Sequence, residues 1–116
     1  MPVTPKRARE RALSLQNTSA GPHFDRIAFR TPRRTFATLA LNGSDMNFML
    51  DLAQQKAFCE GAPDALSPVP GGWGRMGWTH CDLKKVPART FDAVLEAAHA
   101  LANAPKPKRA RPPRSK

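Results

Sequence analysis

The segment Trp78–Leu83 constrains the fold more than any other part of this sequence. Its alternate residues Thr79, Cys81 and Leu83 suit a core, and polar or amphipathic side chains stand between them, which predicts a strand with one buried face. The stretch 91–102 places its apolar residues at helical spacing. Because a one-sided strand needs a covering layer, we predict an α+β fold, a two-layer sandwich in which helices pack on one face of an antiparallel sheet. The other face of the sheet is expected to be open.

The remaining elements are shorter and are read from turn residues and local apolar patterns. Asp51 is placed to cap a helix that runs to about Glu60. Two stretches, 17–22 and 61–72, carry glycine and proline and are predicted to be loop. The other expected elements are a brief helix at Arg7–Leu15, strands at Ile27–Arg30, Thr35–Leu41 and Met46–Leu50, and turns at Thr31–Arg34 and Asn42-Gly43.

Charge divides the 116 residues into three parts. The net charge of +10 is carried mainly by the ends, with +3 in residues 1–12 and +6 in residues 105–116, which leaves +1 for residues 13–104. A chain of this length builds one modest core. We therefore expect a basic flexible arm at 1–12, one folded domain at 13–104, and a disordered tail rich in proline, lysine and arginine at 105–116.

Apolar content and cysteine usage indicate a cytoplasmic protein. No apolar stretch approaches the roughly 18 residues that span a bilayer, and no apolar segment follows the N-terminal charges as in a signal peptide. We expect no membrane association, and a monomer is favoured. Cys59 and Cys81 form neither a metal pair nor a disulfide framework, so both are expected to be free thiols.

The cationic ends indicate an anionic partner, and DNA foremost, because each neutralised phosphate releases counterions whatever the base sequence. A tail that serves only solubility is the alternative. The segment Lys108–Pro112 resembles a minor-groove AT-hook, although Ala110 stands where that motif has glycine. The tail residues expected to contact phosphates are Lys106, Lys108, Arg109 and Arg111.

Within the domain, cations gather at a predicted hairpin end and beside a loop with two tryptophans. Arginines at a turn can contact phosphates bidentately, and tryptophans can stack on unpaired bases. Solvated turns, and a core anchor for Trp73, are the competing interpretations; we favour the anchor for Trp73 and exposure for Trp78. The candidate nucleic-acid contacts in the domain are Arg26, Arg30, Arg33, Arg34, Trp73, Arg75, Trp78, Lys84 and Lys85.

The sequence contains no recognisable set of catalytic, metal-ligating or cofactor-binding residues. Residues 72–77 match G-x-G-x-x-G, but a dinucleotide site needs a strand before the motif and a helix after it. On a strand, Cys81 points away from His80 and is not activated by it, and His99 is expected on a solvent face. We therefore expect no catalytic, metal or cofactor site. Two alternatives stay open: a protein adaptor that uses the open sheet face, and a ligand site in which His80, Asp82 and Arg75 converge.

Six motifs resemble a known family. They are Pro22-His23-Phe24, Ile27-Ala28-Phe29-Arg30, Phe36-Ala37-Thr38-Leu39, the segment Ser67–Arg75 with its Pro-Gly-Gly-Trp-Gly core, Gly77-Trp78-Thr79 and Asp82-Leu83. Together they look like the MmcQ/YjbR family over about Leu13 to Ala102. The resemblance implies a fold similar to CyaY and a DNA-binding role. The chain departs from the family at Pro32–Thr35, where many relatives have a glycine-lysine turn, and at Phe48–Leu50, where the strand often carries a lysine.

Overall fold

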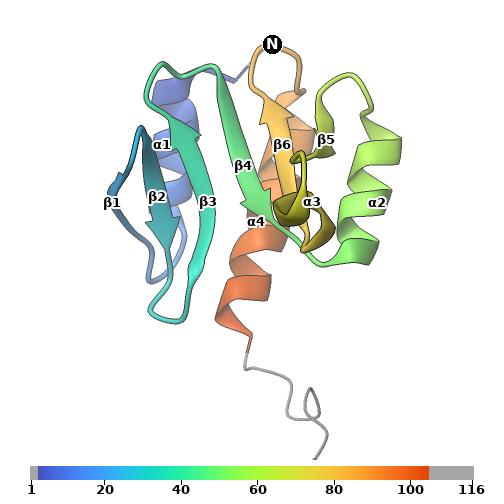
Figure 1. Ribbon diagram of the computed structural model, residues 1–116. Coiled ribbons are helices and arrows are strands. Elements are labelled where there is room, and N and C mark those ends of the chain that lie inside the picture. Colours follow the sequence, from blue (N-terminus) through green and yellow to red (C-terminus); the bar gives the residue numbers. More distant parts are fainter. Residues whose placement is uncertain (1–2, 105–116) are drawn as a thin grey trace, which may run out of the picture.

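The computed structural model describes residues 3–104, which form one antiparallel sheet and four helices. The predicted α+β class is confirmed (Figure 1). The tail residues expected to contact phosphates lie outside the described residues. The helices are α1 (Pro5–Ser14), α2 (Leu52–Gly61), α3 (Gly72–Arg75) and α4 (Ala88–Asn103), and the strands are β1 (Ser19–His23), β2 (Arg26–Arg30), β3 (Thr35–Ala40), β4 (Asp45–Met49), β5 (Leu66–Pro68) and β6 (Trp78–Asp82).

The strands lie in the order β1-β2-β3-β4-β6-β5, and every neighbouring pair is antiparallel. The first four strands are joined by consecutive hairpins. After β4 the chain passes through α2 to the edge strand β5 and returns through α3, so that β6 enters between β4 and β5. Thr38 pairs with Asn47, and Asn47 pairs with His80. Three polar residues from three strands therefore share one face of the sheet.

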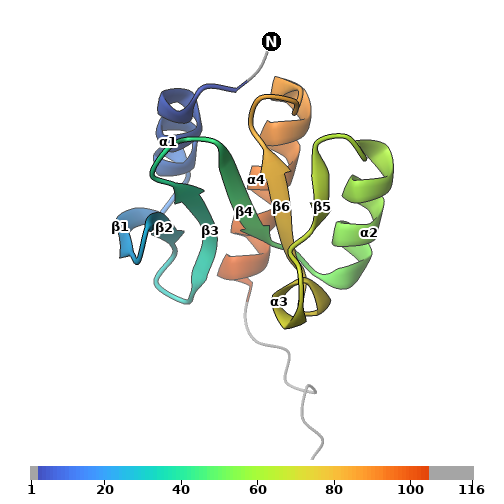
Figure 2. The same cartoon turned by 45° about the horizontal axis from the view of Figure 1, so that its top comes forward.

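Helices α1 and α4 cover the opposite face, as Figures 1 and 2 show together, and α2 flanks the β5 edge. The predicted pattern of β6 is confirmed, because Thr79, Cys81 and Leu83 are buried. The apolar side of α4 is buried against the sheet, where Phe91 meets Phe48 edge to face with ring centroids 5.8 Å apart. The expected Asp51 cap is present as a full capping box with Gln54. These elements were predictable because the spacing of residues within each segment indicates which side is buried or where the helix begins.

Residues 3–12 are folded, which corrects the expectation of a flexible arm in this part of the chain. Val3 is buried, and its backbone N–H donates to the carbonyl of Leu83 at 3.1 Å. Helix α1 begins earlier than expected, at Pro5, and packs Ala8 and Ala12 against the core. The high net charge of residues 1–12 favoured the flexible-arm prediction, whereas the structure pairs one of its cations, Arg11, with acidic residues of α4.

His99 also departs from its expected solvent face. Its Nε2 lies 2.7 Å from the carbonyl oxygen of Gln16, and its ring meets Phe36 edge to face. On the neighbouring turns of α4, Asp92 accepts a hydrogen bond from Arg11 of α1 at 3.0 Å. The polar side of α4 is thus partly covered by α1 and the segment that follows it.

Two strands lie in stretches that were predicted to be loop. β1 contains Gly21 and Pro22, and β5 has three residues and ends at Pro68. Both are edge strands, where a missing backbone donor is tolerated. Their strand conformation follows from pairing with β2 and β6, and short edge strands carry little periodic signal of their own.

Candidate nucleic-acid interface

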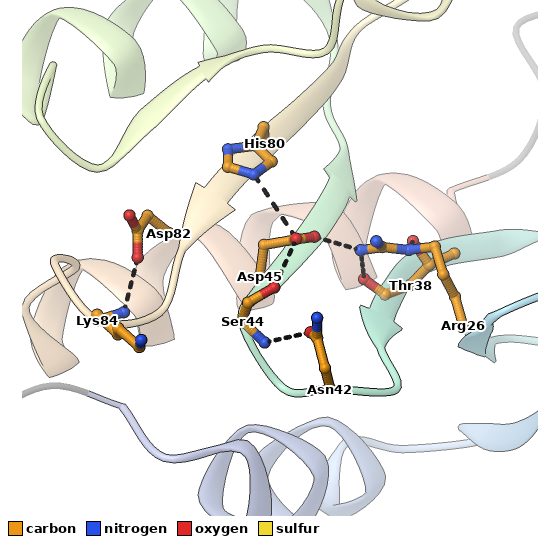
Figure 3. Close-up of polar contacts among 8 residues, drawn as sticks. All are labelled: Arg26, Thr38, Asn42, Ser44, Asp45, His80, Asp82 and Lys84. Atoms are coloured by element: carbon orange, nitrogen blue, oxygen red, sulfur yellow. Dashed lines mark hydrogen bonds and ion pairs between the residues drawn. The ribbon is translucent and has the colours of Figure 1, made fainter.

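The open face of the sheet carries a polar network centred on Asp45 (Figure 3). The Arg26 side chain lies across β3, where its Nε donates to Thr38 Oγ1 at 2.8 Å and its Nη2 donates to the Thr38 carbonyl at 2.9 Å. The same Nη2 lies 2.8 Å from Asp45 Oδ1. Ser44 donates to Asp45 Oδ2 at 3.1 Å, and His80 Nε2 stands 3.9 Å from that oxygen. Hydrogen bonds of the network link β2, β3 and β4, and His80 of β6 stands beside it.

Arg26 is therefore engaged within the protein. Its side chain is 20 % exposed and its charge is balanced by Asp45. Because most of its directed donors are used inside the sheet face, Arg26 is a weaker candidate for a phosphate contact than the arginines described below.

A cavity of about 310 Å³ crosses this face next to the network. Four rings form much of its wall: His23, Phe24, Trp73 and Trp78. Arg26, Thr38, Asn47 and Val69 complete the lining. The cavity thus joins the tip of the β1–β2 hairpin to α3 and the start of β6, segments that are about 50 residues apart in the sequence.

Trp73 is 63 % exposed, contrary to the expected core anchor, whereas Trp78 is partly buried. Two glycines explain the arrangement of this loop. A Cβ on Gly74 would collide with the carbonyl oxygen of Val69, and a Cβ on Gly77, at φ +113°, would collide with that of Leu50. Close backbone packing at these two positions anchors the loop, so Trp73 is not needed as an anchor and its indole faces outward.

Sequence reasoning missed Gln55, which holds this loop in place. It lies on α2, is 8 % exposed, and donates from Nε2 to the carbonyls of Gly74 at 2.9 Å and Trp78 at 3.1 Å. A buried glutamine in a helix gives no sequence signal for such a role, because its two acceptors lie 19 and 23 residues away along the chain.

The β2–β3 turn presents Arg33 and Arg34 to solvent, together with Arg30 at the end of β2. The buried Thr31 shapes the turn: its Oγ1 accepts from the backbone N–H groups of Arg33 at 3.2 Å and Arg34 at 3.3 Å. It also lies 3.5 Å from the carbonyl oxygen of Ala102. The turn therefore packs against the C-terminal end of α4. We call Arg30, Arg33 and Arg34 the arginine turn.

The arginine turn lies at the same end of the sheet as the tryptophan loop. The antiparallel register places the start of β3, the end of β4 and the start of β6 together, and both cartoon views show the turn and α3 toward this end (Figures 1 and 2). β3 and β6 are two strand spacings apart, or about 10 Å at the backbone. Arg75, exposed on α3, belongs to this end as well.

Lys84 and Lys85 lie at the opposite end, beyond the last residue of β6. Lys84 donates its backbone N–H to Asp82 Oδ1 at 2.9 Å. The structure thus divides the predicted cations of the domain: Arg30, Arg33, Arg34 and Arg75 share one end of the sheet, and the two lysines share the other.

The residues considered for catalysis are spread apart. Cys81 is buried beneath the sheet, and burial, with smaller contributions from Asp82 and Asp45, raises the pKa of its thiol to about 12. Arg75 stands at the opposite end of β6 from Asp82. Over residues 3–104 no cluster of three or more histidine, cysteine or acidic side chains is arranged to hold a metal ion. The helices of the same stretch are all too short or too polar to cross a membrane.

Comparison with known proteins establishes similarity of fold. No model of a known protein family matches the sequence, and no curated protein matches it. The fold is similar to the crystal structure of the Deinococcus radiodurans protein DR2400, a DUF419 domain, with a TM-score of 0.76 over 95 % of this chain and 86 % of that one. The two sequences are 15 % identical, so the likeness concerns the fold alone.

Proposed function

We propose that this chain is a non-enzymatic DNA-binding protein of the MmcQ/YjbR family, which contacts the phosphate backbone through the arginine turn and its basic C-terminal residues. Two observations support the family. The motifs that resemble it run from Pro22 to Leu83, and the DUF419 fold that the chain shares is related to the MmcQ/YjbR fold.

The arginine turn is the observation that carries the DNA-binding proposal. Among the described residues, none of its three guanidinium groups has a carboxylate within 4.0 Å, in contrast to Arg11 and Arg26. Two of them stand on a turn whose backbone N–H groups are hydrogen-bonded to Thr31. Exposed arginines without a carboxylate partner on such a turn are suited to bidentate phosphate contacts.

The end of α4 adds to the same surface. Thr31 contacts the carbonyl of Ala102, so the chain leaves the domain beside the arginine turn. The sequence after Ala104 contains six lysines and arginines and no acid. A backbone ligand at this end would therefore meet the cations of the turn and those of the tail sequence together.

The test compares two charge-matched double variants of the full chain in duplex-DNA binding across a salt series. The variant Arg33→Gln/Arg34→Gln removes two contacts at the proposed surface. Lys84→Gln/Lys85→Gln removes two charges at the other end of the sheet. The first variant should bind more weakly. It should also reduce the slope of log affinity against log salt by about 1.8, because each of the two lost phosphate contacts contributes about 0.9 to the slope. The second should change the slope by less than half as much.

A third variant replaces Lys106, Lys108, Arg109 and Arg111 by glutamine in the full chain. The proposal expects residual binding that still depends on Arg33 and Arg34. If this variant binds no DNA and the Arg33→Gln/Arg34→Gln variant binds as the unsubstituted chain does, the folded surface is not the site. Absence of DNA binding by the unsubstituted chain at low salt would overturn the whole proposal.

A further inference from the structure

The cavity on the open sheet face has aromatic walls from two separate segments. Phe24, at the tip of the β1–β2 hairpin, is 93 % exposed and has φ +58°. A left-handed backbone is unfavourable for a bulky non-glycine residue. Because the ring is almost fully exposed, its burial does not offset this cost. On the other side Trp73 is also largely exposed. Such a pair of solvent-facing rings beside one cavity is typical of a surface that gains partners on binding.

Among the polar side chains that line the cavity, Asn47 has a carboxamide oxygen without a partner in the described part of the chain. Its Oδ1 is enclosed and makes no hydrogen bond to the described residues, and its Nδ2 makes none there either. Neighbouring Thr38 and Arg26 are already bonded to each other. An asparagine amide offers one acceptor and two donors. A ligand edge that carries both a donor and an acceptor matches these groups.

The volume of the cavity and the charge around it limit the kind of ligand that it can bind. A cavity of about 310 Å³ lies at the lower end of the range for small-molecule sites, roughly 300–1,000 Å³, so it accommodates one flat group rather than a folded segment. The neighbouring Arg75 is exposed, and the arginine turn lies at the same end of the sheet. A planar group with a donor and an acceptor on its edge, joined to phosphates, fits both features.

We propose that this cavity binds one unpaired nucleobase of single-stranded or locally opened DNA, stacked against Trp73 and Trp78 with its edge on Asn47. The inference rests on the proposed DNA-binding function and makes it more specific. A base inside a continuous duplex has both faces stacked and its pairing edge occupied, so only an unpaired base can enter. Arg75, on the same short helix as Trp73, is the nearby cation proposed to contact the phosphates that flank this base.

The chain provides its own reporter for this site. It contains two tryptophans and no tyrosine, and both tryptophans line the cavity. Tryptophan fluorescence of the full chain therefore reports on the cavity alone. The probes are a short deoxyadenosine single strand, the same strand with its central nucleotides abasic, the corresponding duplex, and deoxyadenosine monophosphate.

We expect the single strand to quench the fluorescence and to bind roughly 5- to 150-fold more tightly than the abasic strand, the range for one base stacked on an aromatic side chain. Trp73→Ala should remove most of that difference and Trp73→Phe should retain most of it. Asn47→Ala should weaken the adenine strand and leave the abasic strand unchanged. Met76→Ala is the matched control, since Met76 is 60 % exposed on the loop and lies outside the cavity.

Two results separate this inference from the proposed function. If the abasic and adenine strands bind equally and Trp73→Ala changes neither, while Arg33→Gln/Arg34→Gln still weakens duplex binding, the base site is wrong and the backbone site stands. If no strand binds but deoxyadenosine monophosphate quenches the fluorescence and Trp73→Ala abolishes the quenching, the cavity is a nucleotide site and the DNA-binding function is wrong. Absence of quenching by every probe overturns the base site.

Discussion

Substitution of Gln55 by methionine tests how the tryptophan loop is held. Methionine keeps the length and apolar stem of the side chain but removes the two donors to the carbonyls of Gly74 and Trp78. Each carbonyl keeps a second partner, the N–H of Gly77 at 3.1 Å and that of Val69 at 3.0 Å. The loss is thus two net hydrogen bonds, about 1 kcal/mol each, and no carbonyl is left wholly unpaired.

We expect Gln55→Met to lower the free energy of unfolding by about 2 kcal/mol, or the melting temperature by roughly 8 °C for a domain of this size. Urea unfolding followed by circular dichroism measures it. Lys56→Met on the same helix is the control, because the ion pair of Lys56 with Glu60 is exposed and contributes little. A loss below about 0.5 kcal/mol for Gln55→Met, or an equal loss for the control, would refute this account of the loop.

Two further predictions concern the close backbone contact just before β6 and the thiol on the buried face of that strand. Gly77→Ala should destabilise the protein by more than about 2 kcal/mol, because φ is +113° and the new Cβ meets the Leu50 carbonyl. Gly61→Ala is the control and should change the urea midpoint of unfolding little, because the space around the new Cβ is open. Similar unfolding midpoints for the two variants would contradict the argument. The pKa of the Cys81 thiol is raised from 9.0 to about 12, so the folded state holds its proton more tightly than the unfolded state does. The free energy of unfolding should therefore fall as pH rises above about 9, by up to about 1.4 kcal/mol per pH unit. In urea titrations at several pH values, Cys81→Ala should remove this contribution to the pH dependence of stability. An unchanged slope of stability against pH in that variant would be evidence against the prediction.

Helices and strands with one buried face were predictable because the alternation of apolar and polar residues appears within each segment of the sequence. The alternation in β6 and the apolar side of α4 each identify a buried face without knowledge of its partner. The Asp51 cap and the Asn42-Gly43 turn depend on neighbours in the chain, and both are present. From these elements the α+β class and the covered face of the sheet follow.

The two edge strands were missed, and the N-terminal helix was predicted without its packing on the core, for a different reason. β1 and β5 are strands because β2 and β6 offer them hydrogen-bonding partners, and proline or glycine in them points locally to a loop. Helix α1 has a low apolar content, and its position is stabilised by the bond of Val3, just before it, to Leu83 and by the bond of Arg11 to Asp92 of α4. Such contacts lie far along the chain and leave no local pattern.

The candidate site shows the same division. The sequence placed Arg33 and Arg34 on a turn and both tryptophans beside a glycine-rich loop, and the structure has them there. It did not indicate that Arg26 would pair with Asp45, 19 residues later, or that Phe24 would share a cavity with Trp73. It also favoured the wrong environment for Trp73, because the close approach of Gly74 to Val69 replaces the anchor that a tryptophan would supply.

By itself, the sequence determined which faces of this protein are apolar, where most of its turns lie, and that its cations gather near the chain ends and at one hairpin. These properties depend on residue type and on neighbours a few positions away. Only the tertiary structure decided that one arginine is neutralised within the sheet while three others are left without an acidic partner among residues 3–104. It also brought four rings from two distant segments around one cavity. Register and strand order set these distances, and both arise from the joint packing of all the elements rather than from any one of them.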